Sequence, residues 1–206
     1  MNAAPIELTA RPVQLRGNRL AQALLRVAGW ELVFDGLPAE QGVAVAYPHT
    51  SNWDFVLAML AKFAVGLPIT FWGKHTLFRI PLFGRWLRHL GGMPVLRHTP
   101  QGAVGTMIGD MRAAREQGRF MWLALAPEGT RGLTAGWRSG FYRVAIEADV
   151  PVALVMLDFG HKRVGFDSFW RLSGDAQADF AMFARRFAGA TGRRPQLAAP
   201  VRPLEG

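Results

Sequence analysis

A histidine and an aspartate lie close together in the segment PHTSNWD, as His49 and Asp54. The histidine follows the apolar run 42–47, which we expect to be a buried strand, and the aspartate falls in the first turn of the helix expected after it. A carboxylate there can reach back to the imidazole, fix its tautomer and leave the other ring nitrogen free as a base. Such a base suits a hydroxyl that belongs to a substrate. On spacing alone, the plainer alternative is that His49 only ends a strand and Asp54 caps a helix.

A second candidate is the loop PEGTRG, which follows the apolar run 119–126. In a tight turn, the backbone amides of Glu128, Gly129 and Thr130 can form a nest for an anion. Arg131 adds a planar guanidinium fork that matches phosphate. The alternative is an ordinary surface turn with a capping threonine.

The segment 71–97 interleaves cations with bulky apolar residues. This composition is typical of a surface that touches anionic head groups beside acyl chains. It also fits core helices with solvated arginines, which is the commoner outcome. The cations are Lys74, Arg79, Arg85, Arg88 and Arg97.

The composition limits the classes of chemistry. The chain has 206 residues, no cysteine and a formal net charge of +9. Without cysteine, disulfides, thiolate nucleophiles, iron–sulfur clusters and thiolate zinc sites are excluded. The positive charge favours an anionic partner: nucleic acid, a membrane surface or a phosphorylated substrate. We find no Walker loop, dinucleotide fingerprint or nucleophile elbow.

The elements needed to position these residues alternate along the chain. Buried strands alternating with helices predict one α/β domain, with a mostly parallel central sheet flanked by helices. In such sheets ligands bind beyond the carboxyl ends of the strands, where His49 and the PEGTRG loop are both expected. We expect an irregular lead-in over 1–15, the domain over 16–190 and a loose tail over 191–206. Strands are expected near 30–36, 42–47, 67–73, 93–96, 119–126 and 150–157, and helices near 16–29, 52–65, 100–117, 138–148 and from 175.

The first helix predicts how the protein meets a membrane. It has an apolar face that includes Leu20, Leu24 and Val27, and a polar face with Arg19 and Arg26. No stretch is long enough to span a bilayer and no signal peptide begins the chain, so we expect a cytoplasmic protein. We predict peripheral, reversible binding to the inner face of the cell membrane. The alternative is that this helix packs its apolar face wholly onto the domain.

The sequence resembles the glycerolipid acyltransferase family, which includes the 1-acylglycerol-3-phosphate acyltransferases. Four blocks match in the order of that family, over about residues 30–160. The first and third blocks are specific, and the other two are looser. The blocks are His49 to Asp54; Gly73, Lys74, Pro81, Gly84 and Arg97; Pro127 to Arg131; and Val150 to Val152.

The resemblance implies transfer of a fatty acyl group from acyl-CoA or acyl carrier protein to a hydroxyl of a lysophospholipid, without cofactor, metal or nucleic acid. His49 would be the base and Asp54 its partner. The substrate phosphate would be held by Arg131, Lys74 and Arg97, in a loop that Glu128, Gly129 and Thr130 shape. The short chain, with no anchor before His49, leaves the acceptor open. A thioester hydrolase, or a basic lipid- or nucleic-acid-binding protein, would also fit.

Overall fold

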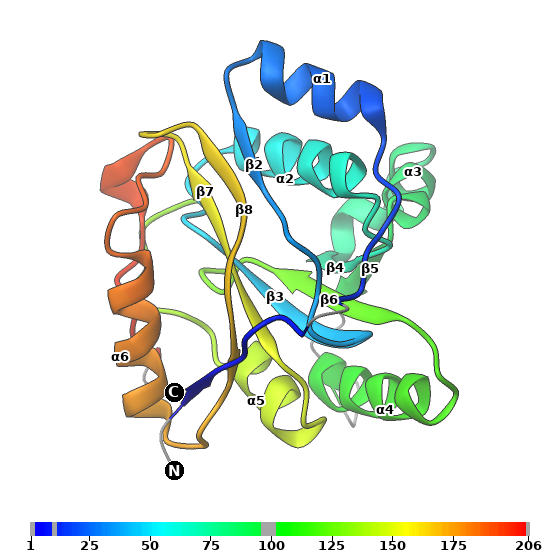
Figure 1. Cartoon of the computed structure of the whole chain (residues 1–206), viewed down its shortest axis with the longest axis vertical. Coiled ribbons are helices and arrows are strands. Elements are labelled where there is room, and N and C mark those ends of the chain that lie inside the picture. The colour runs from blue at the N-terminus through cyan, green and yellow to red at the C-terminus, as the bar shows by residue number, and fades with distance from the viewer. Residues whose placement is uncertain (1–2, 10–11, 96–101, 205–206) are drawn as a thin grey trace.

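A computed structural model of the chain describes residues 3–9, 12–95 and 102–204 (Figure 1). They form an eight-stranded sheet in the order β1-β8-β7-β3-β6-β4-β5, with β2 paired to β8. The strands are β1 Ala4–Pro5, β2 Glu31–Val33, β3 Gln41–Tyr47, β4 Thr70–Lys74, β5 Gly92–Val95, β6 Met121–Leu125, β7 Val152–Asp158 and β8 Arg163–Arg171. The helices are α1 Arg19–Val27, α2 Asn52–Val65, α3 Phe83–His89, α4 Gly102–Glu116, α5 Gly140–Glu147 and α6 Ala176–Phe187, with 3-10 turns η1 His75–Arg79 and η2 Pro195–Leu197.

Strand β3 lies at the centre of the sheet because its residues are apolar on both faces. Val43, Val45 and Tyr47 pack in the main core with side chains of α4, α5 and α6. Ala44 and Ala46, on the opposite face, pack in the clusters that involve α1 and α2. The sheet is therefore covered on both sides, as parallel sheets require. The prediction of a single α/β domain with a mostly parallel sheet is confirmed.

The parallel strands bring the candidate residues to one edge of the sheet. β3 runs parallel to β6 and β7, and β4 runs parallel to β6 and β5. Their carboxyl ends therefore lie on the same side of the molecule. The loop after β3 carries the His49 segment, the loop after β6 carries PEGTRG, and β7 leads into a turn at 158–162.

The side of the sheet formed by β8 and β1 differs from the prediction. Strand β8, which we did not anticipate, runs antiparallel to β7 with an irregularity between Leu154 and Val155. Its Gly165 and Asp167 interrupt the apolar alternation that would have indicated a strand. The lead-in is not wholly irregular either, because Ala4–Pro5 pairs with the end of β8 as β1. Such short pairing depends on β8 and leaves no signal of its own in the sequence.

The tail was predicted to be loose from residue 191, and its described part differs. Ala199 is completely buried, and its carbonyl accepts a hydrogen bond of 3.0 Å from the hydroxyl of Tyr47. Further on, the backbone of Trp137 bonds to Arg202 at 2.8 Å and to Leu204 at 2.8 Å. The backbone groups of this segment therefore find hydrogen-bond partners in other elements.

Helix α1 uses only part of its apolar surface for packing. Ala21 and Leu25 are buried against α2 in a shared cluster. Leu20, Leu24 and Val27 stay exposed, by 69%, 50% and 87%. The alternative in which the whole apolar face packs onto the domain is therefore wrong. Within the described ranges, no helix has the length and apolar character needed to cross a bilayer.

Candidate active site

His49 and Asp54 meet at the carboxyl end of β3. The imidazole Nδ1 lies 3.4 Å from Asp54 Oδ2, and the Asp54 side chain is completely buried. This distance is longer than a strong hydrogen bond, as catalytic contacts often are before substrate binds. The His49 side chain is 18% exposed. Because Nδ1 faces the carboxylate, Nε2 is the nitrogen available to a substrate.

The start of α2 holds Asp54 in place. Ser51 caps the helix, and its hydroxyl accepts from the backbone N–H of Trp53 at 3.1 Å. Asp54 completes the capping box: its Oδ2 accepts from the backbone N–H groups of Thr50 and Ser51, both at 2.6 Å. Its Oδ1 accepts from the Ser51 hydroxyl at 2.9 Å. The capping hydrogen bonds that begin α2 therefore also orient the Asp54 carboxylate.

These donors decide the charge of Asp54. Burial alone would raise the pKa of Asp54, but the interactions with His49 and with Ser51 outweigh it and hold the pKa below its ordinary value. Its place in the first turn of α2 adds the favourable field of the helix N-terminus. Asp54 is therefore anionic at neutral pH and can stabilise an imidazolium at His49.

Glu128 lies behind His49 and is completely buried. Its Oε2 accepts from the backbone N–H of His49 at 2.5 Å, and its Oε1 accepts from the backbone N–H of Ala199 at 3.0 Å. Burial raises the pKa of Glu128 to about 7, although these backbone donors act in the opposite direction. We expected Glu128 to shape the substrate loop. The structure instead directs its carboxylate inward, to the backbone of the His49 segment.

The PEGTRG loop turns sharply at Gly129. Its φ of +67° is one that residues with a side chain rarely adopt, and a Cβ there would lie 2.5 Å from Arg138 Nε. The Gly129 amide donates to the Ala126 carbonyl at 3.1 Å, so it serves the turn and does not complete the expected anion nest. The Thr130 hydroxyl accepts from the Gly132 amide at 3.3 Å. Arg131 is exposed beyond this turn.

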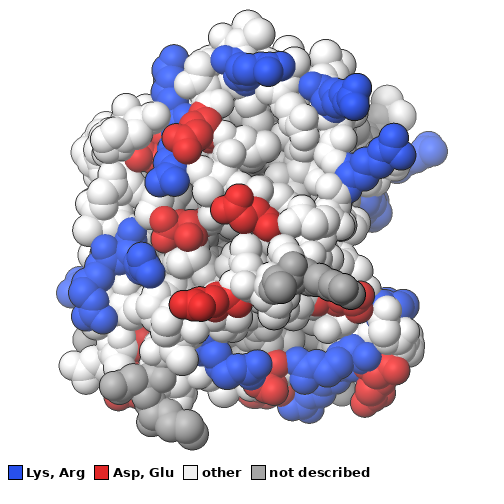
Figure 2. All heavy atoms as spheres, viewed as in Figure 1, with Lys and Arg blue, Asp and Glu red and all other residues white. Residues whose placement is uncertain are grey.

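The other cations that we predicted to hold the substrate phosphate are Lys74 and Arg97. Lys74 ends β4 and is exposed. β4 is two strands from β3, so its end lies about 10 Å from the end of β3. Arg97 lies outside the described residues. On the face shown in Figure 2, lysines and arginines are spread out and mixed with acidic residues, which does not resemble a nucleic-acid-binding surface.

An apolar groove of about 620 Å³ runs along α2 beside the His49 segment. Leu57 and Leu60 of α2 line it, with Leu25 of α1 facing them. Phe159, after β7, and Trp53, in the first turn of α2, also line it, and Trp53 is 61% exposed. Trp53 directly precedes Asp54, so this wall of the groove is continuous with the residues that hold the carboxylate.

The groove has a basic rim. Lys162 and Arg193 line it, and the Arg193 guanidinium lies 5.8 Å from the centroid of the Phe159 ring. Gly192 also lines it, and a Cβ there would lie 2.8 Å from Thr50 Oγ1. A residue of the groove wall, Gly192, therefore packs against Thr50, the residue after His49.

Sequence reasoning missed several of these residues. Thr50 lies inside the first motif, but nothing in its spacing indicates a role. Arg138 and Gly192 come from segments without a motif, and only the fold brings them to the site. A second His–Asp pair, His161 Nδ1 to Asp158 Oδ2 at 2.7 Å, lies on the exposed turn after β7. Among the described residues, no group of three or more His, Asp or Glu side chains is arranged to bind a metal.

Comparison with known proteins agrees with this site. The sequence model of the Acyltransferase family matches residues 32–157, which include β3 and the PEGTRG loop. A solved structure, the 1-acyl-sn-glycerophosphate (LPA) acyltransferase PlsC from Thermotoga maritima, is similar in fold with a TM-score of 0.53 and 17% sequence identity, covering 82% of this chain and 75% of that chain. No curated protein matches the sequence. The extent of the family match shows that the chain belongs to the acyltransferase family.

Proposed function

We propose that this acyltransferase moves a fatty acyl group from acyl-CoA or acyl carrier protein to a hydroxyl of a lysophospholipid such as 1-acylglycerol-3-phosphate, in phospholipid biosynthesis. The observation that carries the proposal is the His49–Asp54 pair, with Nδ1 and Oδ2 3.4 Å apart and the carboxylate completely buried. The pair stands at the strand edge where α/β folds bind ligands. The named activity of the similar PlsC structure supports the choice of acceptor class.

In the proposed reaction, His49 Nε2 takes the proton of the acceptor hydroxyl as its oxygen attacks the thioester carbonyl. The tetrahedral intermediate then expels the thiolate. The thiolate takes this proton from the imidazolium and leaves as a thiol. Asp54 fixes the tautomer and stabilises the imidazolium between these steps. Attack on the thioester is direct, without an acyl-enzyme, which agrees with a chain that has no cysteine.

The apolar groove supports a role in holding the acyl chain. Burying each methylene contributes about 0.8 kcal/mol, and the volume is in the ordinary range for a ligand site. The anionic groups at the head of the donor would meet Lys162 and Arg193 at the rim. For the acceptor, we assign the phosphate to Arg131, with Lys74 and Arg97 as further cations.

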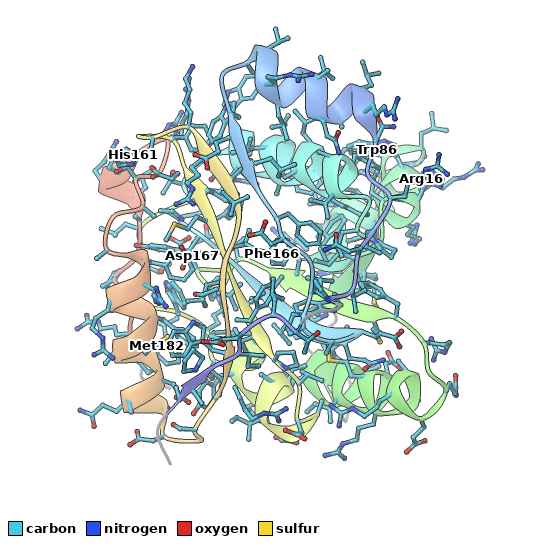
Figure 3. All side chains as sticks on the ribbon, in the orientation of Figure 1. Arg16, Trp86, His161, Phe166, Asp167 and Met182 are labelled. Carbon is cyan, nitrogen blue, oxygen red and sulfur yellow. The ribbon has the colours of Figure 1, made fainter. Side chains whose placement is uncertain are left out.

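The exposed apolar side chains support work at a membrane surface. Beside those of α1, the region 77–90 exposes Leu77, Ile80, Leu82, Phe83 and Trp86. In Figure 3, Trp86 of α3 and Arg16, which precedes α1, appear on the side of the molecule away from α6. Arginines among exposed apolar groups suit anionic lipid. Since both kinds of donor are cytoplasmic thioesters, we place the protein peripherally on the inner face of the cell membrane.

The test is incubation of the purified protein with labelled acyl-CoA or acyl carrier protein and a panel of lysolipids. Labelled diacyl product supports the proposal, whereas free fatty acid alone would identify a hydrolase. His49→Ala should lower the rate about 10²–10⁴-fold, and Asp54→Asn should lower kcat through the wrong tautomer.

The second His–Asp pair supplies a matched control. His161→Ala removes an imidazole that also contacts a carboxylate, but on an exposed turn. It should leave the rate near that of the wild type. Near-wild-type rates in folded His49→Ala would refute the mechanism.

A further inference from the structure

The C-terminal segment 191–204, here called the strap, forms hydrogen bonds with the loops after β3, β6 and β7. The Thr191 amide donates to Asp158 Oδ1 at 3.1 Å, in the turn after β7. The Arg194 amide donates to Thr50 Oγ1 at 3.1 Å, in the loop after β3. The Ala199 amide donates to Glu128 in the loop after β6. The turn after β7 also donates to the strap, from the Phe159 amide to the Thr191 carbonyl at 2.8 Å. Figure 3 labels His161 of this turn.

The contact with Thr50 is close and buried. Thr50 is 1% exposed, and its own amide donates to Asp54 Oδ2 at 2.6 Å. Gly192 packs against the threonine side chain so tightly that a Cβ there would lie 2.8 Å from Oγ1. Thr50 is thus held by the strap on its side chain and by the catalytic carboxylate on its backbone.

The contact with Glu128 acts on the other side of His49. One oxygen of Glu128 holds the His49 amide, and the other holds the Ala199 amide. Ala199 is fixed in turn by Tyr47, whose hydroxyl donates to its carbonyl at 3.0 Å. The strap lies outside the matched family region, which ends at residue 157.

We propose that the strap is a positioning element for His49, acting through the Arg194–Thr50 and Ala199–Glu128 hydrogen bonds. It holds the residue after His49 on one side and the acceptor of the His49 amide on the other. Such a brace matters because a misplacement of about 1 Å in an active site can cost a hundredfold in rate. The inference rests on the proposed acyl transfer for its kinetic consequence, but the physical brace can be measured without turnover.

The first test uses a matched pair at Thr50. Thr50→Val keeps the shape and removes the acceptor for the Arg194 amide, whereas Thr50→Ser keeps the acceptor. We expect Thr50→Val to speed hydrogen exchange in peptides covering residues 48–54. We also expect it to lower kcat roughly tenfold to a hundredfold with donor KM nearly unchanged. Thr50→Ser should restore both values.

The second test removes the other bond. Ala199→Pro deletes the donor, and Ala198, with φ −68° and ψ 124°, already has the extended conformation that precedes a proline. Losing this donor should raise the pKa of Glu128, so the acid limb of the kcat profile should move to higher pH. His49, Asp54 and Tyr47 are the other titratable groups that interact with Glu128, and the variant leaves all of them in place.

The outcomes separate the two claims. If Thr50→Val matches Thr50→Ser in both exchange and kcat, the strap does not position His49. The inference is also overturned if Thr50→Val and Ala199→Pro lower only the melting temperature, with unchanged kcat and pH profile per folded molecule. If the wild type transfers no acyl group, the proposed function fails. Hydrogen exchange in Thr50→Val and Thr50→Ser still decides whether the strap holds the His49 segment in place.

Discussion

The buried carboxylate of Glu128 should make the folded state less stable as pH rises toward 8. Its pKa is raised from an ordinary value of 4.5 to about 7, chiefly by burial. Between these values the folded state keeps a proton on Glu128 that the unfolded state has lost. Stability therefore falls as pH rises through this window, and the full cost is present above pH 7.

The magnitude follows from the shift. A displacement of this size corresponds to about 3 kcal/mol of unfolding free energy. Linkage places about 2.5 kcal/mol of it between pH 5 and pH 8, because the unfolded carboxyl is already partly ionised at pH 5. Other groups with shifted pKa values, such as Asp158, add their own pH dependence, so it must be subtracted by comparison with a variant.

The assay is urea unfolding of the wild type and Glu128→Gln at pH 5 and pH 8. Glutamine has a single acceptor oxygen, so one of the two backbone donors loses its partner, at a cost of about 1–3 kcal/mol at every pH. The quantity to compare is therefore the change in unfolding free energy between pH 5 and pH 8, and not the unfolding free energy at either pH. Wild type should lose about 2.5 kcal/mol more than Glu128→Gln between the two pH values. Equal slopes would refute the burial of an ionisable carboxylate behind His49.

Three further outcomes test the substrate contacts. Arg131→Ala should raise acceptor KM about tenfold to a hundredfold, from the loss of a charged hydrogen bond of about 1.5–3 kcal/mol, and Arg131→Lys should rescue it only partly; equal damage to donor KM would contradict a phosphate role. Leu60→Trp should fill the groove and shift the preference toward shorter acyl chains in a competition assay, whereas Ile146→Trp on α5 should leave the preference unchanged. The wild type should float with anionic vesicles, less at high salt, and a double Leu24→Asp, Val27→Asp variant should float less under both conditions; wild-type protein that never floats would exclude the peripheral assignment.

The central strands could be predicted because a strand that is buried on both faces is a continuous apolar run in the sequence. β3 and β6 are short apolar runs bounded by polar turns, and their order fixes which loops meet. The proximity of His49 and Asp54 also followed from local geometry, since a helix cap returns toward the residue before it. These inferences needed only neighbours along the chain.

The features that could not be predicted depend on distant partners. Residues 191–204 looked loose because prolines and small side chains carry no periodic pattern, yet their amides bond to Asp158, Thr50 and Glu128. The inward direction of Glu128 was hidden for the same reason. Its motif fixes a turn, but only the approach of Ala199 and His49 supplies the donors that bury a carboxylate.

Asp54 and Glu128, the two carboxylates near His49, differ in their pKa because they have different hydrogen-bond donors. Asp54 has donors from its own helix cap, including the Ser51 hydroxyl, and the field of the α2 N-terminus, so it remains anionic. Glu128 has two backbone donors and no helix terminus, so burial dominates and its pKa rises to about 7. The constant negative charge needed beside an imidazolium must then come from Asp54. Glu128 instead links the backbone of His49 to the strap, and its protonation near neutral pH would weaken that link before it altered the charge that Asp54 presents to the base.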